Sequence, residues 1–375
     1  MAGFNPPPYP YDRLKPLAKA AEAHEGGAVN LSVGTPNDPP PQAVLDALAD
    51  ADAGGMLRGY PNSVGSPALR SGISAWLGRQ FGADVSPDGV GVCVGTKEFV
   101  ASLPHFLALR TPGRDTVLYP AVSYPTYAMG ATLAGLRAVP VPVDSEFRLD
   151  LSAVAESDAR RALMLWVNSP GNPAGAVEDL DAAAAWGRHR GILVTSDECY
   201  ADFTWTGKPQ TILGSGREGV LALHSLSKRS NLAGLRLGWY AGDEEVVEYL
   251  REVRKHAGMM VPGPMQRAGL VALEDQRHVD VQRERYRERM ELMRGILAKL
   301  GIQVDMPGGG FYLWAPAPDG NAWALAERLA HKGGALVSPG DFYGPAAATH
   351  VRIALVQPVD RLELVARRLG ADRAS

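Results

Sequence analysis

Lys228 lies between two apolar runs of the sequence, and this setting is the strongest sign of chemistry in the chain. The runs at 220–224 and 236–241 each predict a buried strand, joined by a Ser- and Gly-rich loop. A lysine beside a buried core loses hydration of its charged form, so its pKa falls and its amine can act as a nucleophile near neutral pH. The alternative is a surface-loop lysine among turn residues, because lysines are mostly exposed.

The residues around Lys228 suit a phosphate group. The hydroxyls of Ser225 and Ser227 come just before it, and Arg236 follows in the same loop. Hydroxyls and a guanidinium are good donors to phosphate oxygens. A lysine amine beside a phosphate site suggests a Schiff base with pyridoxal 5′-phosphate.

A second phosphate-like pattern follows the apolar run at 91–94. There Gly95, Thr96 and Lys97 lead into a predicted apolar helix. The free amides and the dipole at such a helix start favour an anion. The pattern is weak alone, since many turns from a strand into a helix have this composition.

Three more residues could serve a cofactor or its substrate. Asp197 ends a predicted strand, where a carboxylate could keep a pyridine nitrogen protonated; the alternative is a helix cap or turn former. Arg352 lies inside the apolar run at 350–355, which favours an anionic ligand such as a substrate carboxylate over a place on an exposed sheet edge. Tyr124 could be a core residue or a platform for a stacked ring.

Strands and helices alternate through the middle of the chain, and the motif-bearing loops follow the strands. This order predicts an α/β protein in which a mostly parallel central sheet is covered by helices and binds its ligand at the carboxyl ends of the strands. The length of 375 residues suits two domains. We expect a large cofactor-binding domain at 46–274, with an N-terminal arm (1–45) joining a smaller α+β domain at 275–375. No GxGxxG follows a strand, which argues against a dinucleotide site.

Composition and charge limit the expected partners. The net charge of −3 and the pI near 6.3 give no reason to expect nucleic acid or an anionic membrane as a partner. Cys93 and Cys199 lie far apart in the sequence and argue against a disulfide scaffold or a thiolate metal site, so no metal is expected. No apolar run of about 18 residues and no signal pattern are present, which predicts a soluble, cytoplasmic protein.

Taken in order, these motifs resemble those of the class I and II aminotransferases, which are pyridoxal phosphate enzymes of fold type I. The resemblance extends over nearly the whole chain and rests on the order and spacing of the motifs, since each is modest alone. The motifs are Tyr60-Pro…Gly65…Leu69-Arg70, Gly95-Thr-Lys-Glu98, Tyr124-Pro-Thr-Tyr127, Asn168-Ser-Pro-Gly-Asn-Pro-Ala-Gly175, Asp197-Glu-Cys-Tyr200, Ser225-Leu-Ser-Lys228…Arg236 and Arg352.

The resemblance implies a role for five residues around the cofactor ring. Lys228 forms the Schiff base and then moves the substrate proton, and Asp197 pairs with the pyridine nitrogen. Tyr200 and Asn172 hydrogen-bond the 3-oxygen of the ring, and Tyr124 stacks on its face. Ala174 stands where the family commonly has threonine, but the asparagine that makes the contact is present.

The resemblance also implies the phosphate, substrate and subunit contacts. The phosphate is held by Gly95, Thr96, Lys97, Ser225 and Arg236. Arg352 binds the α-carboxylate of the amino-acid and keto-acid substrates, and Gly34 and Asn172 line the substrate pocket. Tyr60 reaches the phosphate in the neighbouring subunit, so the active form is expected to be a homodimer.

A finer resemblance concerns the substrate. Several segments look like those of the succinyldiaminopimelate aminotransferases of actinobacterial type, namely 31–36, 197–200, 224–228, 254–262 and 338–344. This implies amino transfer between glutamate/2-oxoglutarate and N-succinyl-2-amino-6-oxopimelate, in the synthesis of lysine and diaminopimelate. The extra carboxylates of that substrate require a second basic residue, for which Arg58, Lys97, Arg229 and Lys255 are candidates. Otherwise, Arg229 is expected to face solvent.

The same motifs leave other functions open. An aspartate, aromatic or LL-diaminopimelate aminotransferase would share them, and the scaffold also supports C–S lyases and cyclopropane-forming synthases. Lyases would be distinguished by their products, ammonia with pyruvate or a released thiol. A non-enzymatic effector-binding domain is disfavoured because the catalytic set is intact.

Overall fold

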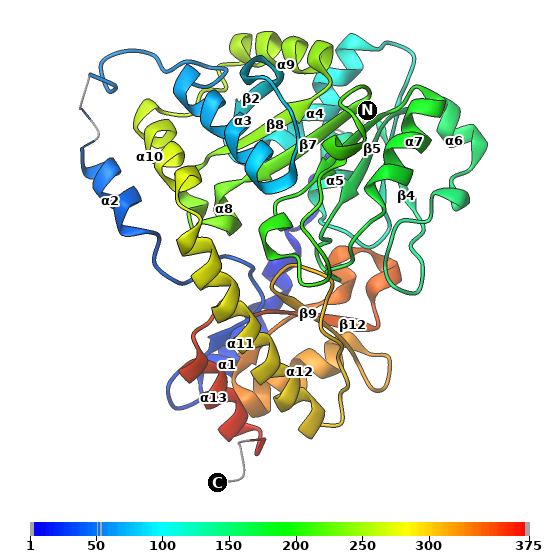
Figure 1. The fold of residues 1–375 in the computed structure, drawn as a ribbon. Helices are drawn as coiled ribbons and strands as arrows, with labels where there is room; N and C mark the ends of the chain where they lie inside the picture. Colours follow the sequence, from blue (N-terminus) through cyan, green and yellow to red (C-terminus); the bar gives the residue numbers. More distant parts are fainter. Residues whose placement is uncertain (1–3, 51, 53–54, 372–375) are drawn as a thin grey trace. The chain divides into compact units, whose positions relative to one another are not determined.

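The computed structural model describes residues 4–50, 52 and 55–371, and these form two compact units (Figure 1). The larger unit contains residues 35–285 and 307–310. The smaller unit contains the N-terminal segment up to Gly34, residues 286–306 and the chain from Phe311 onward. None of the described helices is long and apolar enough to span a lipid bilayer.

The larger unit is built around a mostly parallel seven-stranded sheet, as predicted. The strand order is β2-β8-β7-β6-β5-β3-β4, and β8 alone runs antiparallel to its neighbours. The strands are β2 (Val90–Cys93), β3 (Thr116–Pro120), β4 (Arg137–Val141), β5 (Ala162–Asn168), β6 (Leu193–Asp197), β7 (Val220–Ser225) and β8 (Gly238–Gly242). Every residue of β5 is buried, which is why the central strands read as continuous apolar runs and not as alternating ones.

Helices cover both faces of this sheet (Figure 1). Leu165 points into one core and the next residue, Trp166, into the other, because side chains alternate along a strand. The first core is closed by α2 (Gln42–Ala49), α3 (Pro67–Phe81), α7 (Leu180–Arg190) and α10 (Gly263–Glu274). The second is closed by α4 (Thr96–Arg110), α5 (Thr126–Leu133) and α9 (Glu244–His256), while the short α6 (Glu156–Arg161) leads into β5.

Lys228 lies on a short helix, α8 (Leu226–Arg229), so the prediction of an irregular loop was wrong. Ser225 ends β7 and caps this helix, because its Oγ accepts a hydrogen bond from the Ser227 N–H at 3.0 Å. A helix of one turn shows no apolar periodicity in the sequence, which is why the pattern could not predict it.

The smaller unit has an antiparallel sheet with the order β11-β12-β9 and a parallel pair of β1 and β10. Its strands are β1 (Val29–Asn30), β9 (Tyr312–Pro316), β10 (Ala335–Leu336), β11 (Ser338–Pro339) and β12 (His350–Ala354). Its helices are α1 (Lys15–Glu22), α12 (Ala322–Gly333) and α13 (Val359–Arg368). The long helix α11 (Arg277–Lys299) begins in the larger unit and continues in the smaller one.

Residues 35–45 and 275–285 belong to the larger unit, whereas the sequence pattern placed the boundaries at 45/46 and 274/275. Hydrogen bonds explain the observed division. The Gln282 amide donates to Asp38 Oδ2 at 2.8 Å, and His278 Nε2 lies 2.9 Å from Ser230 Oγ. Both segments are therefore held by the larger unit.

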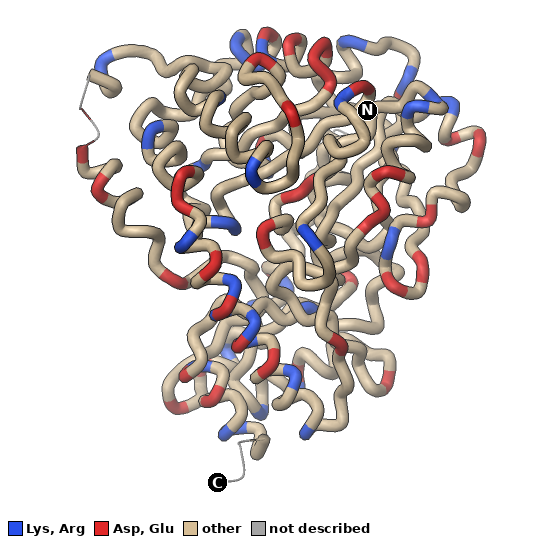
Figure 2. Tube along the Cα trace, in the orientation of Figure 1, with Lys and Arg blue, Asp and Glu red and all other residues tan. Residues whose placement is uncertain are grey.

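Charged side chains of the larger unit lie mainly on its helices and loops (Figure 2). Its central strands carry few of them, and Asp197, at the end of β6, is one. A charge at the end of a buried strand is costly unless it is paired, so this residue marks a place where the sheet meets a ligand or a hydrogen-bond network.

Candidate active site

The ends of four strands bring the predicted cofactor residues to one edge of the larger unit's sheet. Because β2, β5, β6 and β7 all run in the same direction, the segments that follow them meet at their carboxyl ends. These segments carry Gly95, Thr96, Asn172, Tyr200, Ser225 and Lys228, and Asp197 is the last residue of its strand. The structure therefore brings these predicted site residues together at one edge of the sheet.

Arg236 lies against the start of α4, and Gly95 makes this approach possible. Gly95 has a φ of +74°, and a Cβ built there would lie 2.1 Å from Arg236 Nη2, so a side chain would clash with the guanidinium. The guanidinium is held by the carbonyl oxygens of Ala233 (2.9 Å) and Val94 (3.4 Å). A cation and a helix N-terminus are thus placed together, as an anion site requires.

Three hydroxyls complete this donor set. Ser225 Oγ and Ser227 Oγ lie 2.9 Å apart at the start of α8. Thr96 lies close to Gly238, the first residue of β8. A Cβ added to Gly238 would lie 3.0 Å from Thr96 Cγ2 and 3.0 Å from the carbonyl oxygen of His224 on β7. Hydroxyls, helix amides and one guanidinium are the groups that bind a phosphate, so this donor set fits the phosphate of pyridoxal phosphate.

Asp197 is a buried carboxylate whose hydrogen-bond donors are neutral groups. Its Oδ2 accepts from the Tyr127 hydroxyl at 2.9 Å, and its Oδ1 accepts from the Cys199 N–H at 3.2 Å. Burial raises the pKa of Asp197, and the hydrogen bonds from Cys199 and Tyr127 act against that rise. A buried carboxylate that accepts hydrogen bonds from neutral groups favours a cationic N–H partner, such as a protonated pyridine nitrogen.

Asn168, whose role the sequence did not suggest, organises the loop that carries Asn172. Its Oδ1 accepts from the Asn172 N–H at 2.8 Å, and its Nδ2 donates to the Asp197 carbonyl oxygen at 2.8 Å. Asn168 and Asp197 are also register partners of β5 and β6, a relationship that only the sheet reveals. The side chains of Asn172 and Tyr200 are buried next to these strand ends.

Tyr127 links the expected stacking residue to Asp197. Its ring meets the ring of Tyr124 edge-on at 6.0 Å and stacks on Trp166 at 5.1 Å. Burial, together with the charge of Asp197, raises the pKa of Tyr127 well above its usual value, so the phenol stays protonated and donates. Its position three residues after Tyr124 was the available signal, but no role had been assigned to it.

Arg352 and Gly34 belong to the smaller unit. Arg352 is 2% exposed, and its Nη2 donates to the Ser32 carbonyl oxygen at 2.5 Å and to the Tyr11 hydroxyl at 3.2 Å. A Cβ on Gly34 would lie 2.0 Å from Tyr312 Oη, so only glycine permits this close approach. The smaller unit thus holds a buried guanidinium, and the alternative of an exposed edge position for Arg352 was wrong.

The structure changes the set of candidates for a second basic residue. Arg229 is 1% exposed, so it neither faces solvent nor is available as a pocket cation, and both expectations for it were wrong. Its guanidinium donates to the Ala272 carbonyl oxygen at 2.8 Å and to Gln276 Oε1 at 3.0 Å, which explains its burial. Arg58 and Lys255 are exposed and pair with Asp52 and Glu252, while Lys97 is exposed on the first turn of α4.

Comparison with known proteins identifies similar chains. The family model "Aminotransferase class I and II" matches residues 27–369. A 4-dedimethylamino-4-oxo-anhydrotetracycline transaminase of Streptomyces rimosus is 43% identical over 97% of this chain and 99% of its own. An LL-diaminopimelate aminotransferase of Desulforudis audaxviator is 35% identical over 97% of this chain and 95% of its own. The solved structure of a probable N-succinyldiaminopimelate aminotransferase of Thermus thermophilus has a TM-score of 0.86 and 31% identity, covering 96% of this chain and 99% of that one.

Proposed function

Because the chain belongs to the class I and II aminotransferases and is therefore a pyridoxal phosphate-dependent enzyme, we propose that it exchanges an amino group between glutamate/2-oxoglutarate and N-succinyl-2-amino-6-oxopimelate. The observation that carries the reaction type is the joint placement of Lys228, the buried Asp197 and the phosphate donors at one sheet edge. The identity of the amino acceptor is supported and tested separately from the reaction type.

Each side chain at this edge has a task in the proposed reaction. When bound, pyridoxal phosphate supplies an electron sink for the negative charge that develops at the substrate α-carbon. Asp197 accepts the pyridine N–H, and Tyr127 keeps its carboxylate oriented. Lys228 Nζ takes the proton from the substrate α-carbon as a general base and, as a general acid, would deliver it to the carbon that takes up the amino group. Tyr200 and Asn172 donate to the ring oxygen, and Tyr124 stacks on the ring.

Arg352 is proposed to bind the α-carboxylate of both substrates. A planar guanidinium can hold a carboxylate with two parallel hydrogen bonds, which also fixes the orientation of the α-carbon. The burial of this side chain supports the role, because a buried arginine interacts strongly with an anion in surroundings of low dielectric constant.

Two observations support the diaminopimelate family of substrates. One similar structure is named a probable N-succinyldiaminopimelate aminotransferase, and several similar proteins are named LL-diaminopimelate aminotransferases. Lys97, on the first turn of α4, is the candidate we favour for the distal carboxylates, since Arg229 is buried among protein partners. A second candidate acceptor is 4-dedimethylamino-4-oxo-anhydrotetracycline, which the identity to the Streptomyces rimosus transaminase favours.

The substrate proposal is tested by loading the enzyme with an amino group from L-glutamate and then adding one acceptor at a time. We expect N-succinyl-2-amino-6-oxopimelate to be converted with the highest kcat/KM, and Lys97→Met to raise its KM while leaving that of glutamate unchanged. Faster conversion of the oxo-anhydrotetracycline, or of oxaloacetate, would contradict the proposal and leave the reaction type in place.

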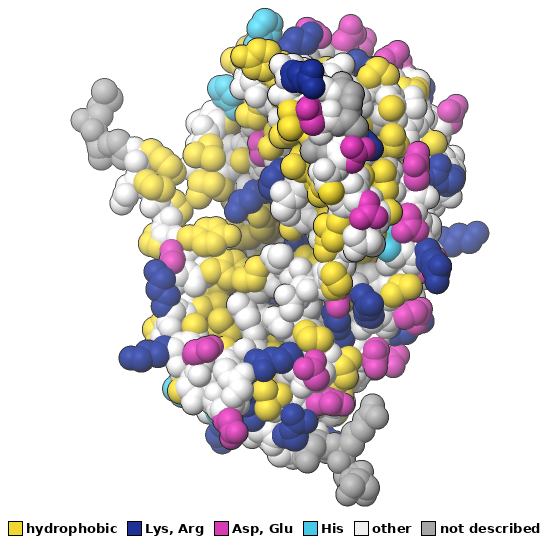
Figure 3. Space-filling view, turned by 90° about the vertical axis from the view of Figure 1, so that its left-hand side faces the viewer, with side chains coloured by type: hydrophobic (Ala, Val, Ile, Leu, Met, Phe, Trp, Pro, Cys, Tyr) yellow, Lys and Arg dark blue, Asp and Glu magenta, His cyan; other side chains and the backbone are white. Residues whose placement is uncertain are grey.

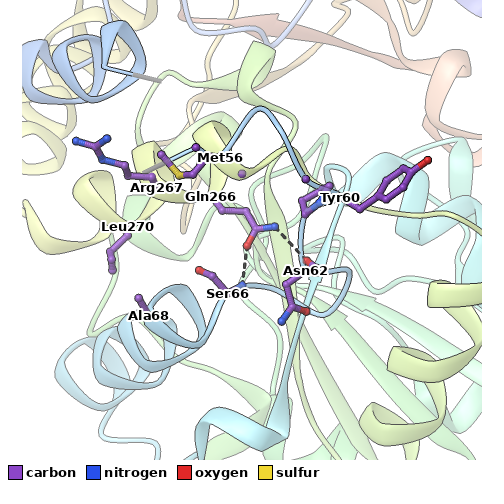
Figure 4. A pocket seen from close by; sticks show the side chains of 12 residues that line it. Met56, Tyr60, Asn62, Ser66, Ala68, Gln266, Arg267 and Leu270 are labelled. Atoms are coloured by element: carbon purple, nitrogen blue, oxygen red, sulfur yellow. Dashed lines mark hydrogen bonds between the residues drawn. The ribbon is translucent and has the colours of Figure 1, made fainter. Parts of the chain in front are cut away.

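A homodimer with shared sites is the proposed active form. Tyr60 is 95% exposed and Leu57 64% exposed, an unusual exposure for large apolar side chains. Tyr60 lines a pocket of about 410 Å³, as does Met56, the residue before Leu57. Gln266 fixes one wall of this pocket, because its side chain bonds the Ser66 N–H and the Asn62 carbonyl oxygen (Figure 4). The Tyr60 ring points away from this pocket, and hydrophobic side chains gather on the side shown in Figure 3. These features suit a surface that a second copy covers.

A further inference from the structure

Tyr11, on the N-terminal segment, is in direct contact with Arg352. It lies on a 3-10 helix (Pro10–Leu14), and its hydroxyl accepts a hydrogen bond from Arg352 Nη2 at 3.2 Å. The same hydroxyl lies 3.1 Å from the hydroxyl of Tyr343. The sequence predicted an N-terminal arm for this part of the chain and no part in the chemistry.

The contacts around Arg352 fix both the position and the plane of its guanidinium. Nη2 donates to two oxygens, the carbonyl of Ser32 at 2.5 Å and the hydroxyl of Tyr11 at 3.2 Å. The guanidinium carbon lies 4.2 Å from the ring centroid of Tyr312 and 4.9 Å from that of Tyr343. Aromatic rings beside a guanidinium restrict its rotation, and two acceptors on one nitrogen set its direction.

While it is protonated, the phenol of Tyr11 can orient this guanidinium without neutralising it. Burial alone would raise the pKa of Tyr11, but the charge of Arg352 and hydrogen bonds with Tyr343, Ser338 and Arg352 lower it overall, so the two groups interact strongly. A protonated phenol is an uncharged acceptor. It can therefore orient the guanidinium and leave its positive charge to attract a carboxylate, which an aspartate in the same place would not do.

The Tyr11 ring is anchored independently of its hydroxyl. It packs on Phe342 at 5.4 Å between centroids and stacks on Tyr9 at 5.5 Å. Replacing the tyrosine by phenylalanine keeps both ring contacts and removes only the oxygen that Arg352 bonds. The hydroxyl can thus be tested without loss of the fold.

We propose that Tyr11 is a positioning residue for the substrate α-carboxylate, acting by holding the Arg352 guanidinium in the orientation that receives it. This inference rests on the proposed role of Arg352 in carboxylate binding. Because every amino-acid and keto-acid substrate carries an α-carboxylate, the effect of Tyr11 is common to all substrates and independent of their side chains.

The experiment compares the holoenzyme with Tyr11→Phe and with the control Tyr9→Phe, which removes a neighbouring hydroxyl from the same segment. Each protein is titrated with L-glutamate, L-aspartate and L-alanine while the cofactor spectrum and the single-turnover rate are recorded. For Tyr11→Phe we expect the apparent Kd of each responding amino acid to rise about threefold to tenfold, as for the loss of one hydrogen bond of ordinary strength. The limiting rate, the cofactor content and the Tm should stay unchanged, and Tyr9→Phe should behave as wild type.

Four outcomes would overturn this inference. An unchanged Kd in Tyr11→Phe, or a loss confined to one amino acid, would contradict it and leave the proposed function standing. A wild-type protein that responds to none of the amino acids would contradict the proposed function as well. A fall in cofactor content or Tm would show that Tyr11 serves the fold and not the carboxylate.

Discussion

The hydroxyl of Tyr127 lies 2.9 Å from Oδ2 of Asp197, and both side chains are buried. Tyr127 comes from the start of α5 and Asp197 from the end of β6, so the sheet and a helix on its face meet in this one hydrogen bond. Through this bond the stacking of Tyr127 on Trp166 supports the Asp197 carboxylate.

Replacing Tyr127 by phenylalanine should weaken catalysis more than cofactor binding. A hydrogen bond to a charged group is worth about 1.5–3 kcal/mol, so we expect kcat to fall about tenfold to a hundredfold. The phosphate donors are untouched, and the cofactor content of the purified protein should therefore stay near one per chain. A steady-state assay with L-glutamate measures kcat, and release of the cofactor in alkali measures the cofactor content. Unchanged kcat would show that Asp197 needs no help from Tyr127.

Replacing Arg254 by methionine should lower both stability and cofactor affinity. Arg254 is 2% exposed and bonds both carboxylate oxygens of Glu98, at 2.7 and 2.8 Å. Glu98 in turn accepts the Val94 N–H at 3.0 Å, directly before Gly95 of the phosphate site. Breaking a buried ion pair costs about 3 kcal/mol, and the free energy of unfolding should fall by that amount.

The matched control for this variant is Arg110→Met, which breaks the surface pair with Glu245. An exposed pair contributes about 1 kcal/mol or less, so this control should lose little stability and no cofactor affinity. Equal losses in the two variants, measured by urea unfolding and cofactor titration, would refute the link from Arg254 to the phosphate loop.

Glu178 should make the stability of the protein depend on pH. Burial raises its pKa from 4.5 to about 7, although the Leu149 N–H bonds its carboxylate. The pKa of Glu178 is higher in the folded chain than in the unfolded chain. Its contribution to the free energy of unfolding is therefore complete below about pH 4.5 and is lost as the pH rises through about 7. The difference corresponds to about 3 kcal/mol.

In Glu178→Gln this contribution to the pH dependence should disappear, because the amide stays neutral at every pH. Urea unfolding of both proteins at pH 5 and pH 8 measures it: the wild type should lose more stability than the variant between the two values. Parallel losses in wild type and variant would show that another group titrates in this range.

Shared active sites would be revealed by mixing two inactive variants. In a heterodimer of Lys228→Ala with Tyr60→Ala, one site would combine an intact Lys228 with an intact Tyr60 from the other subunit. Refolding the two in equal amounts should restore about a quarter of wild-type activity, given random pairing of subunits in a two-fold dimer. If Tyr60 acted within its own chain, no site would be intact and the mixture would stay inactive.

The sequence predicted site residues where a residue capable of chemistry stands at or just after the end of a predicted strand. Asp197, Lys228 and Gly95 could be assigned because apolar runs mark the strands and parallel strands end at one edge. The sequence could not predict the burial of a side chain whose partners are groups far away in the sequence. Arg229 is buried because it bonds Ala272 and Gln276 of a later helical region, and nothing near it in the sequence signals these partners.

The same limit explains why Tyr127, Asn168 and Tyr11 were given no role. Tyr127 contacts Asp197 from a helix and Asn168 contacts it from the neighbouring strand, while Tyr11 reaches an arginine 341 positions later. Such contacts follow from the fold and leave no local pattern of spacing or composition. Motif order could therefore predict which residues contact the cofactor, but not which residues orient them.

The central claim is that Lys228 carries the cofactor and receives an amino group from an amino acid. It is tested by the absorbance spectrum of the purified protein, taken before and after L-glutamate is added and repeated with Lys228→Ala. We predict a band of the lysine-linked cofactor between about 360 and 430 nm that falls as a band near about 330 nm rises, with no such response in the variant. A protein that shows no band after pyridoxal phosphate is supplied, or a Lys228→Ala variant that responds as the wild type does, would contradict the claim.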